Sequence, residues 1–211
     1  MLNEYHQSAR RRQEQGIPPL PLTAEETHEL TQLLENPGQS PKEELLYLLT
    51  HRIPPGVDEA AYIKATWLSS IAQKTLISNL ISPLKATELL GTMIGGYNVS
   101  ALIELLQNND TKLAECAAEG LSKTLLVYDS VHEIRKLAEK NIFAKKVINS
   151  WTNGDWFTSK PTLPQRITVT VFKVEGETNT DDLSPATHAT TRPDIPLHAM
   201  AMLETKEPKG I

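Results

Sequence analysis

A polar segment near the C-terminal end carries the residues best suited to bind a ligand. Residues 176–186 gather hydroxyl groups, an amide and the carboxylates of Asp181 and Asp182 into a loop expected to follow a strand. Polar groups on such loops commonly converge on ligands. Arg192 follows beside Pro193, and an arginine guanidinium suits two-point recognition of a carboxylate. These residues predict a site for an anionic small molecule, while an ordinary solvated loop remains the alternative.

The cysteine and histidine content predicts neither a catalytic residue nor a metal site. Cys116 is the single cysteine, so the chain cannot form an internal disulfide or complete a cysteine-ligated zinc or iron–sulfur site. It lies among small apolar residues of an expected helix with no basic neighbour, which favours a buried structural thiol over a nucleophile. The histidines show no metal-ligand spacing on one helix. They are His6, His28, His51, His132, His188 and His198.

Three other features are better explained without a ligand. Arginines 10–12 could meet a phosphate backbone, but the formal charge of -5 favours a solvated helix face. The run Gly95-Gly96-Tyr97-Asn98 has no strand before it and is typical of a turn between helices. The tryptophans favour core or domain-contact anchors; they are Trp67, Trp151 and Trp156.

The overall composition is that of a soluble globular protein. The chain has 211 residues, of which 39% are hydrophobic and 22% charged, enough for one large domain or two small ones. No stretch approaches the roughly 20 apolar residues that cross a bilayer. The N-terminal residues lack the apolar run of a secretory signal. We therefore expect a cytoplasmic protein.

Residues up to about 157 predict a mainly α domain of eight or nine short amphipathic helices. Four helix starts carry capping signals: a Thr–Glu capping box, an Asp cap and two Ser-Pro pairs. These starts lie at Thr23, Ser40, Asp58 and Ser82. Further helices are expected at residues 99–107, 111–126, 130–140 and 141–151. No fixed-period repeat is visible, so the pattern fits a stacked helical array or an irregular bundle.

The pattern changes after this helical part. Residues 158–166 contain two prolines and resemble a linker. Residues 167–174 are rich in β-branched side chains, alternate with polar residues through Val171 and predict a strand. The remaining residues are expected to form loops, apart from a short helix at 196–203. One strand cannot stabilise itself, so we expect residues 167–211 to be the beginning of a second domain that is not completed here.

Several runs are similar to the bacterial aconitase B family. The sequence VTVFKV stands at 169–174, GETNTDDLSPA at 176–186 and RPDIPLHA at 192–199. RIPPGVDEAAY stands at 52–62, ELLGTM at 88–93 and GGYN at 95–98. The similarity extends over nearly the whole chain, but it covers only the front of the family's much longer sequence.

This resemblance implies a fold, a reaction and site residues. Residues 1–157 would form a HEAT-like helical array, and 167–211 the first part of the swivelling domain that caps the active site. The reaction would be that of an aconitate hydratase: dehydration of citrate to cis-aconitate and rehydration to isocitrate in the tricarboxylic acid cycle, with dehydration of 2-methylisocitrate as well. Arg192 matches the family's substrate-binding arginine. Asp181, Asp182 and Ser184 belong to the same motif as supporting residues.

The resemblance also implies what must come from elsewhere. The family's [4Fe-4S] cluster is held by three cysteines of a later catalytic core, and a further Ser-Ser-Arg motif is absent here. We therefore expect this chain to need the remaining aconitase domains and to be inactive by itself. The alternative is a stand-alone helical interaction module, since the family's helical region is described as serving self-association, with messenger RNA bound when the cluster is lost.

Overall fold

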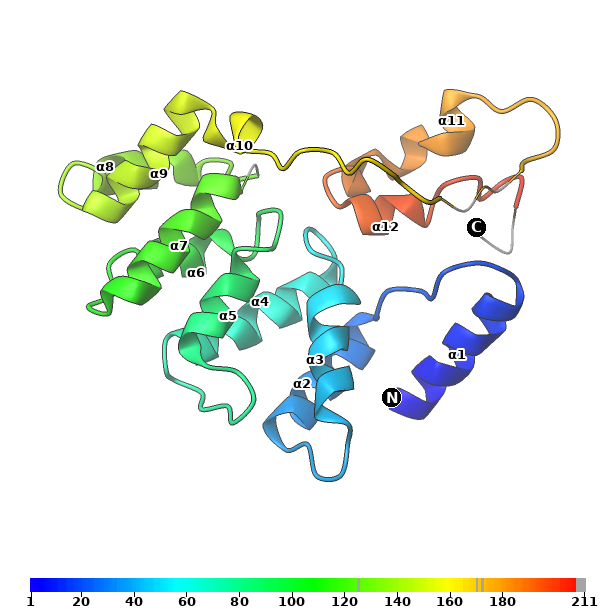
Figure 1. Ribbon diagram of the computed structural model, residues 1–211, viewed down its shortest axis with the longest axis horizontal. Coiled ribbons are helices and arrows are strands. Elements are labelled where there is room, and N and C mark those ends of the chain that lie inside the picture. The colour runs from blue at the N-terminus through cyan, green and yellow to red at the C-terminus, as the bar shows by residue number, and fades with distance from the viewer. Residues whose placement is uncertain (125, 170, 172, 208–211) are drawn as a thin grey trace.

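The computed structural model describes residues 1–124, 126–169, 171 and 173–207, which form a mainly helical protein (Figure 1). The helices up to residue 158 are α1 (Leu2–Glu14), α2 (Ala24–Glu35), α3 (Lys42–His51), α4 (Glu59–Ala72), α5 (Pro83–Leu90), α6 (Val99–Leu105), α7 (Thr111–Lys123), α8 (Ser130–Leu137), α9 (Ile142–Asn153) and α10 (Asp155–Thr158). Later come α11 (Thr180–Leu183), the 3-10 helix η1 (Ala186–Thr191) and α12 (Ile195–Ala199). The prediction of a mainly α protein is confirmed.

Three of the predicted helix starts are confirmed by side-chain caps. Thr23 and Glu26 form the expected capping box, with each side chain accepting a backbone N–H of the other residue. Asp58 accepts from the Ala60 N–H at 2.7 Å, and Ser82 accepts from the Lys85 N–H at 3.1 Å. These caps satisfy backbone donors that the first helical turn leaves open.

The fourth predicted start is one residue early. Ser40 is the expected cap, but Pro41 is the N-cap of α3 and makes no side-chain capping bond. The Ser40 N–H instead donates to the Pro37 carbonyl at 2.8 Å. Ser40 is therefore held in the preceding turn rather than at the helix boundary.

The helices pack in a connected series. α4 contacts both α2 and α5, α5 contacts α7, and α7 contacts α6 and α9. At the contact between α5 and α7, Gly91 and Gly120 bring the two backbones together. A Cβ at Gly120 would lie 2.8 Å from the Gly91 Cα, closer than real Cβ contacts allow. Among the helices described here, none is long and apolar enough to cross a membrane.

The predicted strand at 167–174 is wrong for the residues that the structure describes. Residues 167–169, 171, 173 and 174 have no strand pairing, while Thr170 and Phe172 lie outside the described residues. Val169 and Val171 are 71% and 83% exposed, so their alternation serves no buried face. The physical reason is that a strand needs a hydrogen-bonded partner, and no described segment pairs with this one.

The expectation of loops after residue 176 is also wrong, because α11 and η1 form there. Helix α12 corresponds to the short helix expected at 196–203, although it begins at Ile195 and ends at Ala199. In Figure 1 the chain leaves α10, runs across the molecule and returns to the side where α1 and α3 lie. The C-terminal segment, which we define as residues 180–207, therefore lies near the N-terminal helices.

Candidate functional site

A buried carboxylate attaches the C-terminal segment to the helical part. Asp194 is fully buried, and its Oδ2 accepts hydrogen bonds from the backbone N–H groups of Gly56 at 2.9 Å and Val57 at 3.2 Å. Its Oδ1 accepts from the Leu197 N–H at 3.1 Å and so caps α12. One side chain thus satisfies donors from the loop before α4 and from the start of α12.

Gly56 is required for this close approach. A Cβ at position 56 would lie 2.6 Å from the Ile94 Cδ1 and 3.1 Å from the Asp194 Oδ2. Asp194 was not recognised from the sequence as an attachment residue. Its place before a helix start is a recognisable cap signal. Nothing in the local sequence indicates its contact with Gly56 and Val57, which lie 138 and 137 positions earlier in the chain.

The two predicted supporting carboxylates have different surroundings. Asp182 and Asn179 form a capping box at the start of α11, and Lys206 Nζ lies 2.9 Å from Asp182 Oδ2. The backbone hydrogen bond from Asn179 lowers the pKa of Asp182, and the bond from Lys206 lowers it further. Asp182 is therefore an ionised structural group, whereas Asp181 is exposed on the same helix.

Ser184, the third predicted supporting residue, belongs to a chain of hydroxyl and imidazole groups. Its Oγ lies 2.8 Å from Nε2 of His198, and Nδ1 of His198 lies 2.9 Å from Oγ1 of Thr191. The Thr191 hydroxyl donates to the His188 carbonyl at 2.8 Å. These contacts connect α12 with residues at both ends of η1, and they could not be recognised from sequence spacing.

Arg192 directly follows η1 and is close to this group. Its Nη2 donates to the Ser184 carbonyl at 3.3 Å, and its side chain is exposed. A guanidinium carries five N–H donors, so one bond to a carbonyl leaves donors for a carboxylate. The structure therefore brings Arg192 and Ser184 together, with Asp182 in the helix before Ser184.

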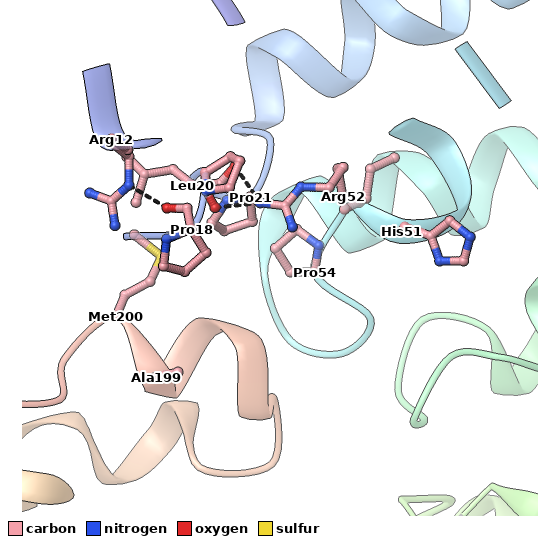
Figure 2. Close-up of a pocket in the computed structure, with 11 residues that line it drawn as sticks. Arg12, Pro18, Leu20, Pro21, His51, Arg52, Pro54, Ala199 and Met200 are labelled. Atoms are coloured by element: carbon pink, nitrogen blue, oxygen red, sulfur yellow. Dashed lines mark hydrogen bonds between the residues drawn. The ribbon is translucent and has the colours of Figure 1, made fainter. Parts of the chain in front are cut away.

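A cavity of about 320 Å³ lies where α12 approaches the N-terminal helices (Figure 2). Its polar wall is built by two arginines that hold the proline-rich segment between α1 and α2. Arg12 donates to the Pro18 carbonyl at 2.6 Å, and Arg52 donates to the Leu20 carbonyl at 3.0 Å and to Pro19. Arg12 was expected on a solvated face, but its side chain helps to order this loop.

The remaining candidate groups have structural roles. Cys116, expected to be buried, is only half-buried. Desolvation is the main reason that the pKa of its thiol is raised to about 11, so a thiolate ligand is disfavoured, and this cysteine does not fit an iron–sulfur cluster. Trp67 and Trp151 donate to Glu35 and to the Leu121 carbonyl as packing anchors, whereas Trp156 is 41% exposed. Over the described residues, no cluster of histidine, cysteine and acidic side chains could hold a metal.

Two family models match the chain on either side of the proline-containing segment. A model described as the aconitate B N-terminal domain matches residues 4–157, and one described as the aconitate hydratase 2 N-terminus matches residues 169–211.

Similar full-length proteins cover the same region. A protein named aconitate hydratase B from Synechocystis sp. is 60% identical over all 211 residues, which make up 24% of that protein. Proteins of the same name from Escherichia coli and Helicobacter pylori are 53% and 48% identical, each over 97% of this chain and 24% of its own length. The chain thus spans about a quarter of the length of the curated relatives it matches.

Proposed function

The chain belongs to the aconitase B family, and on that premise we propose that it is the N-terminal part of an aconitate hydratase. In the complete enzyme it contributes scaffold, a wall of the substrate channel and one substrate-binding residue, Arg192. The reaction interconverts citrate and isocitrate through cis-aconitate, with 2-methylisocitrate as a further substrate. Its partners are the remaining aconitase domains, and its compartment is the cytoplasm.

The proposal divides the chain into three parts. Residues 1–157 form a HEAT-like helical domain, 158–166 a linker, and 167–211 the beginning of the swivelling domain. The series of contacts from α2 to α9 supports a stacked helical array. The family models support the division, because one ends at residue 157 and the other begins at residue 169.

The observation that carries the substrate-binding role is the setting of Arg192. Its guanidinium is exposed and donates to the Ser184 carbonyl, while Asp194, two residues later, accepts a hydrogen bond from Gly56 of the helical part. An exposed guanidinium on an anchored backbone can present a planar pair of N–H donors to one carboxylate of a tricarboxylate.

The [4Fe-4S] cluster of the family supplies a Lewis-acid iron when it is bound by the complete enzyme. The single cysteine of this chain does not fit that role, so the cluster ligands belong to other domains. The part that this chain plays is to bind and orient the anionic substrate. Asp182 and Ser184 support the Arg192 loop, and no proton transfer is assigned to them.

Arg192→Lys in the complete enzyme tests the proposal. Lysine keeps the positive charge but loses the planar fork, which should lower kcat/KM for citrate by about 10- to 100-fold, as expected for loss of a charge-assisted hydrogen bond. Arg166→Lys is the matched control, because Arg166 is exposed in the segment between the two matched regions. An unchanged kcat/KM in Arg192→Lys would contradict the proposed substrate-binding role of Arg192.

A further inference from the structure

His198 occupies a position between two hydroxyl groups that come from different short helices. Its Nε2 faces Ser184, the C-cap residue of α11, and its Nδ1 faces Thr191, the last residue of η1. His198 itself belongs to α12. One imidazole therefore spans the three short helices around Arg192.

For a neutral imidazole, the hydrogen bonds select a single tautomer. The Thr191 hydroxyl has one hydrogen, and it is donated to the His188 carbonyl, which can only accept. Thr191 Oγ1 must therefore accept from His198, so Nδ1 carries the hydrogen. The Nε2 atom of the neutral ring then has a free lone pair and accepts the Ser184 hydroxyl hydrogen.

This arrangement reaches Arg192 through Ser184. The Ser184 side chain is held by His198, and the Ser184 carbonyl accepts from Arg192 Nη2. On the other side of Arg192, Asp194 accepts two backbone N–H groups from the loop before α4. The arginine thus lies between two anchored points, one at Ser184 and one at Asp194.

We propose that His198 is a positioning residue for Arg192, which it fixes by joining Ser184 to Thr191 as the Nδ1-protonated tautomer. The proposal rests on the proposed function, because the orientation of Arg192 matters through the carboxylate that it binds. His198 does not contact the substrate in this account. Its removal leaves the guanidinium in place but lets the loop at Ser184 move.

The tautomer is tested first, by the 15N chemical shifts of the imidazole in the chain itself. The wild-type signals should report a hydrogen on Nδ1 of His198. Thr191→Val removes the acceptor, so the hydrogen should move to Nε2, where the Ser184 oxygen can accept it. Thr190→Val is the control, because Thr190 is an exposed neighbour of the same residue type. A hydrogen on Nε2 in the wild type, or no change in Thr191→Val, would overturn the proposal.

The consequence for Arg192 is tested in the complete enzyme. His198→Ala should raise KM for citrate by about tenfold and change kcat less, in line with the effect of misplacing a binding group. The KM of His198→Asn should be intermediate, since the asparagine amide can still donate to Thr191 but has no acceptor atom at the position of Nε2, which faces Ser184. His132→Ala, an exposed histidine of α8, is the control and should leave KM unchanged.

The two proposals fail differently. If Arg192→Lys lowers kcat/KM while His198→Ala leaves KM unchanged in a folded enzyme, the positioning role is wrong and the proposed function stands. If Arg192→Lys has no effect, the proposed function is wrong and the positioning role falls with it. A rise in KM in His198→Ala that His198→Asn restores in part supports the positioning role, whereas a fall in KM in His198→Ala counts against it.

Discussion

Replacing Asp194 by Asn should release the C-terminal segment from the helical part. The Asp194 carboxylate is fully buried and accepts the Gly56 and Val57 N–H groups at 2.9 and 3.2 Å. An asparagine side chain carries no charge, and its single oxygen can replace only one of the two carboxylate oxygens, so its NH2 group must face either the Leu197 N–H or the Gly56 and Val57 N–H groups, none of which it can accept. The substitution therefore weakens both bonds and leaves at least one buried donor without a partner.

The size of the effect follows from these two bonds. Hydrogen bonds to a charged group contribute about 1.5–3 kcal/mol each. Removing the charge of the Asp194 acceptor should therefore favour local opening by about 3 kcal/mol. That corresponds to roughly a hundredfold larger population of the released state. Only the contact between the loop and the C-terminal segment needs to open, so the loss need not unfold the helices.

Amide hydrogen exchange at Gly56 and Val57 measures this opening. Exchange at both positions should become about a hundredfold faster in Asp194→Asn, while amides inside α4 and α7 keep their protection. Asp181→Asn is the matched control, since Asp181 is an exposed carboxylate of the same segment. Equal exchange in the wild type and Asp194→Asn would refute the assignment of Asp194 as the attachment.

Two further predictions concern the helical part. Lys64 is 2% exposed and burial lowers the pKa of its amine to about 8, so Lys64→Met should raise the free energy of unfolding at pH 7 by up to about 3 kcal/mol. The Lys64 amine binds its proton more tightly in the unfolded chain than in the folded protein, so the free energy of unfolding of the wild type should rise between about pH 8 and 10.5 and approach that of the variant. Urea unfolding measures both proteins across this range, and a difference in free energy of unfolding that does not change with pH would contradict the prediction. Gly120→Ala should lower the free energy of unfolding by about 1–3 kcal/mol, because the added Cβ would lie 2.8 Å from the Gly91 Cα. Thermal unfolding would measure this, with exposed Glu119→Ala as the control, and equal melting temperatures would exclude tight packing of α5 on α7.

Local features of this protein could be predicted from its sequence because their partners lie within one helical turn. The capping box at Thr23 and the caps at Asp58 and Ser82 each join residues two or three positions apart. The turn at Gly95-Gly96 has a similar basis, since positive φ angles of 131° and 73° suit glycine.

The strand and the attachment could not be predicted in this way. Residues 167–174 have the alternation of a strand, but pairing depends on a partner that the local pattern does not specify. Asp194 and Gly56 are 138 residues apart, and their contact depends on the fold of the chain between them. Arg192 was recognised by residue type and resemblance, whereas the role of His198 depends on hydroxyl groups 14 and 7 positions away.

The equilibrium dissociation constant of tricarballylate shows whether Arg192 binds the tricarboxylate substrate. This tricarboxylate lacks the hydroxyl group that the reaction removes, so calorimetry with the complete enzyme measures binding without turnover. We expect a dissociation constant about 10- to 100-fold higher in Arg192→Lys than in the wild type or in Arg166→Lys. The same dissociation constant in all three proteins would contradict the claim that Arg192 binds the substrate.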